Sequence, residues 1–404
     1  MNEGPKGAEV VRIAARGDGV TADGRFVAGA VPGDRVLADG GIVKGPDHLA
    51  PACRHFGPCG GCQLQHASDA LLARFAETRC LEPLARLGIR PGDVRPPHLS
   101  PPFSRRRASL RAVRRGGRVE LGFNEEGAHR LIDLGECPVM LPALFALLAP
   151  LRRLLLPLMT ERSVVGVTMA MTDQGIDLLL TNITAERLPV VEALTAFAAA
   201  HALARLSVEG PLGVETVVAP AVPSVTLGGV PVALPPGAFL QATGDGEAAL
   251  VAAVREAVGE ARRVADLFAG VGTFALPLSG SARVLAVDGA GPALQALDRA
   301  ARAAGRPVEV QHRDLFRRPL EAAELAPFDA VVFDPPRSGA IAQSTALAQS
   351  RVPLVVAVSC NPATFARDAE RLVAGGHVLA TLWPVAQFRW STHVELVALF
   401  RRGR

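Results

Sequence analysis

The chain has 404 residues, of which 49% are hydrophobic and 20% are charged, and its formal net charge is +4. Because one hydrophobic core rarely grows beyond about 250 residues, this length indicates two or three domains. The apolar runs are interrupted well before the ~18 residues that a membrane helix needs, and "MNEGPKGAEV" lacks the apolar core of a signal peptide. We therefore expect a soluble, cytoplasmic protein with no membrane partner.

The first 50 residues have the pattern of a small β-barrel. Short β-like runs alternate with Gly-Asp and Pro-Gly-Asp turns over residues 8–45, a spacing that is typical of small all-β modules. A helical stretch follows at residues 67–88, where leucines and Phe75 recur at helical spacing. From about residue 100 to 240 strands and helices mix with many prolines, and the pattern predicts no particular topology.

Three of the six cysteines lie within ten residues of one another, at Cys53, Cys59 and Cys62. In a reducing compartment, such a group is better explained by metal ligation than by disulfides. Cys137, in "GECPVM", can supply a fourth thiolate. The C-x5-C-x2-C spacing favours an iron-sulfur cluster, while zinc stays an alternative because it also accepts four thiolates. Cys80 falls in the expected helix and is interpreted as a packed thiol.

An arginine-rich segment marks a candidate surface for a nucleic acid. Residues 104–118 hold seven arginines and no acidic residue, and residues 51–130 together hold 14 Arg and seven Asp or Glu. Such a segment would attract a phosphate backbone, because each basic contact releases condensed counterions. A solvated, charged strand explains the segment equally well when it is considered alone.

The last third of the chain, from about residue 262, alternates apolar strands with helical or polar segments. The expected strands are "RRVADLFAG", "ARVLAVDGA", "PVEVQHRD", "FDAVVFDPPRSG" and "VPLVVAVSC". This alternation predicts a doubly wound parallel sheet, which binds its ligands beyond the carboxyl ends of its strands. The residues at those ends therefore form the candidate site.

A glycine-containing loop, "DLFAGVGTFA", follows the first of these strands. Gly270 and Gly272 permit a tight turn and a close approach of the backbone to a ligand. Asp288, at the end of the second strand, can accept hydrogen bonds from both ribose hydroxyls of an adenosine, although a helix-capping Asp would also fit this position. The loop alone suits NAD as well as an adenosine-containing methyl donor.

Two features favour S-adenosylmethionine over NAD. The chain turns from "HVLATLWPVAQF" through "RWST" into "HVELVALFRR" without a helix, so the last two strands form a hairpin, as in class I methyltransferases. The fourth strand ends in "DPPRSG", where two prolines after Asp334 hold an extended loop over the pocket. Arg337 stands where amine-methylating enzymes usually place an aromatic residue, which argues against methylation of an exocyclic amine.

Methylation at a ring carbon needs a nucleophile and a base that face the same ring. C5 of uracil becomes carbanion-like only after a thiolate adds to C6, and the C5 proton must then be removed before the thiolate can leave. Cys360, at the end of the fifth strand, and Glu395, in the closing hairpin, would supply the two groups. Considered singly, Cys360 fits a buried thiol and Glu395 a surface carboxylate, but their combination with a nucleotide pocket favours catalysis.

These residues resemble the RNA 5-methyluridine methyltransferase family. "SCNPATFARD" looks like its nucleophile motif, "DPPRSG" like its strand-four motif, "STHVELV" like its general-base motif and "FLQATGDGE" (239–247) like its Gln-containing segment. The resemblance implies Cys360 as nucleophile and Glu395 as base. It also implies contacts to S-adenosylmethionine from the residues Gln241, Phe268, Thr273, Asp288, Asp314 and Asp334, beside the loop glycines Gly270 and Gly272.

The resemblance further implies a fold class and a division of the chain. We expect an α/β protein with a class I methyltransferase Rossmann-like sheet at residues 241–404, an OB-like TRAM β-barrel at 1–50 and a central α+β domain at 51–240. The central domain would carry the RNA-binding arginine segment. As in several family members, it would also carry a [4Fe-4S] cluster, whose ligands would be Cys53, Cys59, Cys62 and Cys137.

The expected function is methylation of C5 of a uridine in RNA. Family members with both a TRAM-like domain and the cysteine cluster mostly act on 23S ribosomal RNA, so the resemblance favours that RNA as the partner. Two alternatives are the same chemistry on tRNA, and a non-catalytic RNA-binding or ribosome-assembly factor that retains the fold. The presence of both Cys360 and Glu395 argues against the second. We expect the enzyme to act as a monomer.

Overall fold

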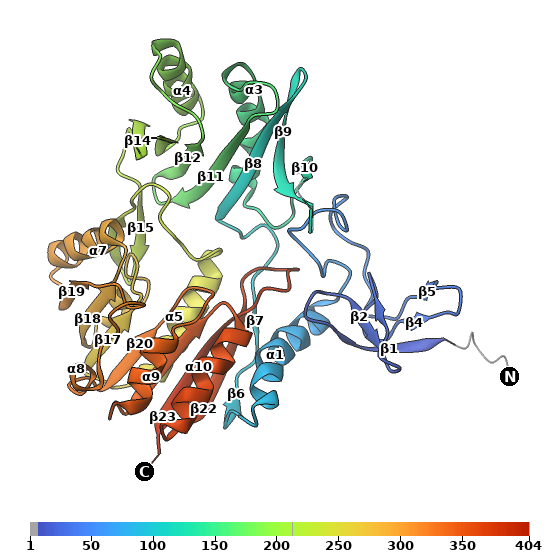
Figure 1. The fold of residues 1–404 in the computed structure, drawn as a ribbon. Helices are drawn as coiled ribbons and strands as arrows, with labels where there is room; N and C mark the ends of the chain where they lie inside the picture. The colour runs from blue at the N-terminus through green and yellow to red at the C-terminus, as the bar shows by residue number, and fades with distance from the viewer. Residues whose placement is uncertain (1–6, 126, 129, 212, 404) are drawn as a thin grey trace.

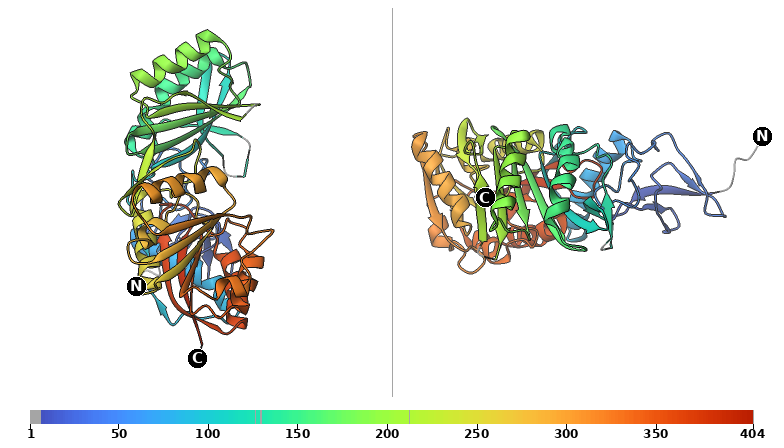
Figure 2. Two further views of the ribbon diagram at one scale, coloured as in Figure 1. Left: turned by 90° about the vertical axis from the view of Figure 1, so that its left-hand side faces the viewer. Right: turned by 90° about the horizontal axis from the view of Figure 1, so that it is seen from above.

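The computed structural model describes residues 7–125, 127–128, 130–211 and 213–403. The chain forms three bodies, each built on its own sheet: a small N-terminal sheet, a central seven-stranded sheet and a C-terminal nine-stranded sheet (Figure 1). Figure 2 shows the central and C-terminal bodies as two stacked lobes, with the N-terminal sheet projecting to one side. Among the described residues, no helix has the length and apolar character needed to cross a bilayer.

The N-terminal sheet is antiparallel and small, with strand order β3-β2-β1-β4-β5. Its strands are β1 (Ala8–Ile13), β2 (Gly19–Thr21), β3 (Phe26–Val27), β4 (Arg35–Val36) and β5 (Ile42–Val43). Over the described part of this region, the edge strands β3 and β5 do not pair with each other. The curled five-stranded sheet is consistent with the small OB-like module expected from the sequence.

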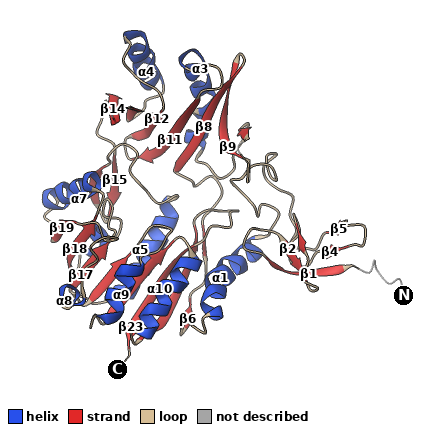
Figure 3. Ribbon diagram, in the orientation of Figure 1, coloured by secondary structure: helices blue, strands red, loops and turns tan. Residues whose placement is uncertain are grey.

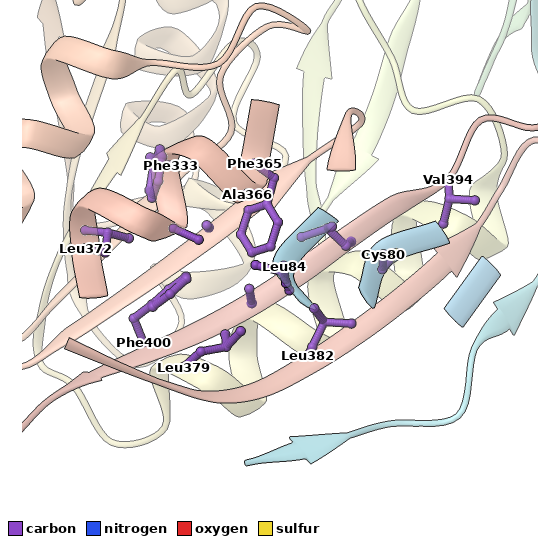
Figure 4. Close-up of a cluster of buried hydrophobic side chains, with 14 of the residues drawn as sticks. Cys80, Leu84, Phe333, Phe365, Ala366, Leu372, Leu379, Leu382, Val394 and Phe400 are labelled. Atoms are coloured by element: carbon purple, nitrogen blue, oxygen red, sulfur yellow. The ribbon is translucent and has the colours of Figure 1, made fainter. Parts of the chain in front are cut away.

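Helix α1 (Asp69–Arg86) belongs by packing to the C-terminal body. It begins after Ser68, whose hydroxyl accepts a hydrogen bond from the N–H of Leu71 at 3.3 Å. Figure 4 shows Cys80 and Leu84 of this helix among hydrophobic side chains of the C-terminal sheet, and Cys80 is fully buried there, as a packed thiol.

Two short strands extend this association. β6 (Asp93–Val94) and β7 (His98–Leu99) both pair in parallel with β22 (His377–Ala386), near the end of the chain. Residues 69–99 thus pack with the C-terminal sheet rather than with the central one. The predicted domain boundaries at residues 50 and 240 do not follow this packing and stay predictions.

The central sheet has the order β10-β9-β8-β11-β12-β13-β14, in which only β12 and β13 pair in parallel. Its strands are β8 (Arg107–Arg115), β9 (Arg118–Asn124), β10 (Leu131–Asp133), β11 (Val164–Thr172), β12 (Gly175–Thr181), β13 (Arg205–Gly210) and β14 (Gly213–Val218). Three helices pack on it: α2 (Pro142–Ala146), α3 (Leu148–Leu158) and α4 (Leu188–Ala200). A separate hairpin, β15 (Ser224–Leu227) and β16 (Val230–Ala233), leads into the C-terminal body.

The C-terminal sheet has the order β19-β18-β17-β20-β21-β23-β22-β6, with β7 pairing to β22 off this path. Its remaining strands are β17 (Arg263–Leu267), β18 (Arg283–Asp288), β19 (Val308–His312), β20 (Ala330–Phe333), β21 (Leu354–Ser359) and β23 (Glu395–Arg402). Strands β17 to β21 are parallel, and β23 is antiparallel to both β21 and β22. The doubly wound sheet and the terminal hairpin expected from the sequence are confirmed.

One helix, α5 (Gly244–Val258), precedes the parallel strands of this sheet, and five follow them: α6 (Ala275–Leu278), α7 (Gly291–Ala303), α8 (Ala322–Leu325), α9 (Ile341–Gln349) and α10 (Pro362–Ala374). Alternating side chains fill two cores, so that in β20 Val331 and Phe333 join one face while Ala330 and Val332 join the other. Helices α1, α9 and α10 cover the first face, and α5 and α7 the second (Figure 3). Burial on both faces explains the continuous apolar runs of these strands.

Candidate active site

A cleft of about 730 Å³ opens at the carboxyl ends of the parallel strands, where the linker 235–241 from the central lobe also lines it. Clefts of this size hold nucleotide-sized ligands. The cleft brings together nine of the ten residues that the sequence predicted for catalysis and donor binding. They are Gln241, Phe268, Gly270, Thr273, Asp288, Asp314, Asp334, Cys360 and Glu395.

Gly272 is the tenth residue, and it does not line the cleft. A Cβ at this position would lie 2.5 Å from Cδ1 of Leu297 on α7, and the backbone has a φ of +96°. Glycine is therefore required there by the close packing of α7 on the loop and by the left-handed backbone. Gly272 therefore allows α7 to pack against the loop, on the side away from the cleft, and does not contact the cleft itself.

The loop after β17 is held by the end of β18. Phe268 has a φ of +65°, a left-handed conformation that costs energy for a residue with a Cβ and often marks functional sites. The N–H of Gly270 donates to Oδ2 of Asp288 at 2.8 Å, and the N–H of Ala290 donates to Oδ1 at 2.6 Å. Asp288 thus braces the glycine loop and the start of α7 while its carboxylate still lines the cleft.

Phe316 is an aromatic residue of the cleft that the sequence did not predict. Phe316 is half exposed in the loop after β19, with its ring centroid 5.5 Å from that of Phe268. Asp314 shapes this loop, because its Oδ1 accepts hydrogen bonds from the N–H groups of Phe316 and Arg317. A single Phe in a loop carries no periodic signal, so only the folded chain identifies it as a lining residue.

Cys360 and Glu395 both line the cleft and come from neighbouring strands. The pairing of β21 with β23 ends at Ser359 and Leu396, the residues directly before Cys360 and directly after Glu395. The two side chains are close enough for Glu395 to raise the pKa of the Cys360 thiol. Glu395 is 5% exposed, and Cys360 is half-buried. Asp334, at the end of β20, lines the same space. The two strand ends that the sequence singled out therefore meet at one point.

Burial raises the pKa of both carboxyl groups at this end of the cleft. It raises the pKa of Glu395 to about 8, and the carboxylate of Asp334 contributes to that rise, while the side chain of Gln387 opposes it. Burial also raises the pKa of Asp334 to about 7, and burial together with Glu395 raises the pKa of the Cys360 thiol to about 11. Such groups ionise more readily when a cation binds beside them, so the site favours a positively charged ligand.

The Asn-Pro turn after Cys360 ties two loops of the cleft together. Oδ1 of Asn361 accepts a hydrogen bond from the N–H of Ala363 and caps α10, while its Nδ2 donates to the carbonyl oxygen of Arg337 at 3.0 Å. The hydroxyl of Thr364 donates to the same carbonyl at 3.1 Å. The "DPPRSG" loop and the cysteine are thus held in one fixed arrangement.

Three arginines of the 104–118 segment make contacts with other residues of the protein. Nε of Arg106 donates to the carbonyl oxygen of Gln241 at 3.2 Å, and its Nη2 pairs with Glu247 at 2.5 Å. The guanidinium of Arg107 lies over the ring of Phe239 at 4.7 Å from the centroid, and that of Arg105 lies near Phe388 at 5.5 Å. The start of the segment therefore joins the central lobe to the cleft. Further along the segment Arg111, Arg115 and Arg118 are exposed, and its contact with RNA stays a prediction.

The four candidate cluster cysteines lie close together, with Cys59 in the core of the central sheet and Cys62 in the core of the C-terminal body. Cys59 and Cys62 are buried, and Cys53 and Cys137 are half-buried. Burial raises the pKa of Cys62 to about 12, and the other three thiols add to the rise because they are close by. Among the described residues, no three His, Cys, Asp or Glu side chains converge tightly enough to hold a single metal ion.

Known proteins with similar sequences decide the family. Residues 309–402, from β19 to β23, match the family model described as tRNA (Uracil-5-)-methyltransferase. The chain is 48% identical to an RNA methyltransferase of Zymomonas mobilis, over 98% of this chain and 99% of that protein. It is 35% identical to a 23S rRNA (uracil(1939)-C(5))-methyltransferase of Halomonas elongata, over 98% of this chain and 90% of that protein. The chain belongs to the RNA (uracil-5-)-methyltransferase family.

As an RNA methyltransferase, the protein is an enzyme, which confirms the resemblance seen in its motifs. Its structure is similar to that of a Pyrococcus abyssi tRNA (uracil-54, C5)-methyltransferase solved with S-adenosyl-L-homocysteine, with a TM-score of 0.74 over 98% of this chain and 99% of that chain. At 21% identity this likeness supports the shared fold. The individual roles of Cys360, Glu395 and the other cleft residues of this methyltransferase stay predictions.

Proposed function

We propose that this methyltransferase transfers the methyl group of S-adenosylmethionine to C5 of a uridine in RNA, with Cys360 as the nucleophile and Glu395 as the base. The observation that carries the proposal is that these two side chains, from the adjoining ends of the neighbouring strands β21 and β23, line one cleft. A thiol and a carboxyl group on opposite strands can address adjacent carbons of one flat ring. The family to which the chain belongs performs the same reaction type.

The cleft fits the methyl donor in its charge and its shape. When bound, the donor supplies a methyl group on a positively charged sulfur, and Asp334 and Glu395 are carboxyl groups that a nearby cation would stabilise in their charged form. The rings of Phe268 and Phe316 provide apolar walls for an adenine, and Asp288 can accept hydrogen bonds from ribose. We assign further donor contacts to the remaining predicted cleft residues, which are Gln241, Gly270, Thr273 and Asp314.

The reaction then proceeds by covalent catalysis on the uracil ring. The thiolate of Cys360 adds to C6, and the electrons of the C5–C6 double bond move toward O4 to form an enolate. C5 of this enolate takes the methyl group, and the donor leaves as S-adenosylhomocysteine. Glu395 removes the C5 proton, the double bond re-forms, and the C6–S bond breaks to release the thiolate. The net result exchanges one C5 proton for one methyl group.

The relatives favour ribosomal RNA as the substrate. The Halomonas elongata protein, named for uracil 1939 of 23S rRNA, is similar over nearly the whole chain, whereas the tRNA enzyme of Pyrococcus abyssi shares only the fold. We therefore propose 23S rRNA as the substrate, with tRNA as the alternative. We also propose that the small N-terminal sheet is a TRAM-like module that contributes contacts to this RNA.

Methylation of transcribed RNA tests this proposal directly. The enzyme, with isotopically labelled S-adenosylmethionine, should convert uridine to 5-methyluridine in 23S rRNA fragments at least about ten times faster than in tRNA, a difference of roughly 1.4 kcal/mol in the activation barrier. Mass spectrometry of digested nucleosides measures the product. Formation of 5-methyluridine in tRNA alone would establish the tRNA alternative. Absence of 5-methyluridine from both RNAs would overturn the proposed function.

We propose that Cys53, Cys59, Cys62 and Cys137 bind a [4Fe-4S] cluster. The donor set fits in its chemistry, because four thiols lie in one region and are partly buried. A [4Fe-4S] cluster takes four thiolate ligands.

Iron analysis of the cysteine variants checks this assignment. Protein purified without oxygen should be brown and contain roughly four irons and four sulfides per chain, and Cys62→Ser should lose both the colour and the iron. Cys80→Ala is the matched control, since Cys80 is a buried thiol of α1 outside the group, and it should keep the full iron content. A colourless protein that contains zinc would contradict the cluster.

A further inference from the structure

A buried amide lies directly behind the cleft wall and was not singled out by the sequence. Gln387 is the first residue after β22 and is 2% exposed. It does not line the cleft, yet its side chain contacts Gln241, Ala242 and Glu395, of which Gln241 and Glu395 do. Gln387 thus connects the linker that enters α5 with the strand that carries the proposed base.

The contacts fix which way each amide points. The backbone N–H of Ala242 can only donate, and its partner is Oε1 of Gln387 at 2.9 Å. The other end of the Gln387 amide, Nε2, is therefore the donor to Gln241, at 2.7 Å. Because a donor needs an acceptor, the Gln241 atom in this contact is its Oε1. The Nε2 of Gln241 remains as the group that presents hydrogen-bond donors to the cleft.

The side chain of Gln387 also lies near Glu395. It stabilises the charged form of this carboxyl group and lowers its pKa against the effect of burial. The other charged and titratable groups within electrostatic range of Glu395 come from four elements: Asp334 and Arg337 after β20, Arg107 on β8, Cys360 after β21 and, from outside the cleft, the buried Cys80 on α1. Among these neighbours of Glu395, Gln387 is the neutral hydrogen-bond donor.

Packing prevents the Gln387 side chain from turning away. A Cβ added to Gly246, in the first turn of α5, would lie 2.6 Å from Cβ of Gln387 and 3.3 Å from its Oε1. The helix can approach so closely only because residue 246 is glycine. Thr243, which caps α5 by accepting a hydrogen bond from the N–H of Gly246, holds the turn in place.

We propose that Gln387 is a positioning residue, which orients the amide of Gln241 so that its N–H groups meet an acceptor on the bound methyl donor, and which at the same time holds the carboxylate of Glu395 in place. The single side chain of Gln387 thereby positions both Gln241, which would bind the methyl donor, and Glu395, the proposed base. This inference rests on the proposed function, because both partners act through that reaction.

Kinetics of Gln387→Met test the proposal, since methionine keeps the length of the side chain and removes its hydrogen bonds. The KM for S-adenosylmethionine should rise about tenfold, and the KM for RNA should stay unchanged. In the pH profile of kcat/KM, the acid limb should shift to higher pH by about one unit, because the pKa of Glu395 rises when its carboxylate loses a hydrogen-bond donor. In a Gln241→Met background, the effect on the donor KM should disappear, because the two residues act as one unit.

A matched control separates positioning from general stability. Gln343, on α9, is also fully buried and makes two hydrogen bonds, to the N–H and the carbonyl oxygen of Leu320. Gln343→Met should lower the melting temperature without moving either KM or the pH profile. If Gln387→Met does not fold, Gln387→Glu keeps the size and the acceptor for Ala242, and its carboxyl group should move the acid limb further up.

The outcomes are distinct. An unchanged donor KM and an unchanged pH profile in a folded Gln387 variant, or equal changes in Gln343→Met, would overturn the positioning role. A wild-type enzyme that forms no 5-methyluridine would instead overturn the proposed function, and would do so before any variant is compared.

Discussion

Replacing Cys360 with alanine should abolish the covalent adduct that the wild-type enzyme forms with RNA containing 5-fluorouridine, and should lower methylation by roughly 10⁴-fold or more. Fluorine at C5 cannot be removed as a proton, so the wild-type reaction stops with the ring still joined to sulfur. Denaturing gel electrophoresis of labelled RNA separates this adduct from free RNA. The loss is expected to be large because no other cysteine lines the described cleft.

The matched control for this experiment is Cys80→Ala, which removes a fully buried thiol of α1 and leaves the cleft intact. It should form the adduct at the wild-type rate. An adduct that persists in Cys360→Ala would exclude Cys360 as the nucleophile. No adduct with the wild-type enzyme would argue against covalent catalysis altogether.

Glu395→Gln should produce the opposite effect, namely a covalent adduct with ordinary RNA. Glutamine cannot take the C5 proton, so the methylated ring stays attached to Cys360, and turnover should fall by about 10² to 10⁴-fold. Mass spectrometry of the trapped species should show the mass of the protein, the RNA and one methyl group. Glu309→Gln, an exposed carboxyl group on β19, is the control and should turn over normally. Fast turnover by Glu395→Gln would exclude Glu395 as the base.

Glu395→Gln should be more stable than the wild-type protein at alkaline pH. The pKa of Glu395 is raised from 4.5 to about 8, so between these values the folded state holds a proton that the unfolded state has lost. Stability that comes from this group is therefore present below about pH 4.5 and is lost as the pH rises toward 8. Glutamine is not subject to that loss, so Glu395→Gln should be more stable than the wild type at pH 8, by on the order of a few kcal/mol. Urea unfolding at pH 5 and pH 8 measures the difference.

The positions of Cys360 and Glu395 could be predicted because they follow from local patterns. Apolar runs alternating with helices specify a parallel sheet, and the carboxyl ends of its strands lie along one edge. The missing helix between the last two strands specifies the hairpin that brings Glu395 back to that edge. Each of these signals is contained within a few tens of residues.

The environment of these residues could not be predicted in the same way. The sequence predicted that both glycines of the loop contact the ligand. In the structure, only Gly270 of the two lines the cleft, and residue 272 must be glycine because a Cβ there would clash with Leu297 of α7. The sequence marks the arginine segment as a candidate surface for a nucleic acid, yet its first three arginines, Arg105, Arg106 and Arg107, are held by aromatic rings and by Gln241 and Glu247. In both cases the partners come from distant parts of the chain.

The sequence by itself determined which candidate groups stand at the strand ends, because the alternation of strands and helices places a thiol, a carboxyl group and a glycine loop at one edge of the sheet. Only the tertiary structure decided how those groups are tuned. Burial sets the raised pKa of Glu395, and Gln387 reaches across 145 residues to Ala242 to set the direction of the Gln241 amide. Desolvation and hydrogen-bond direction depend on which atoms surround a group, and that arrangement exists only after the chain has folded.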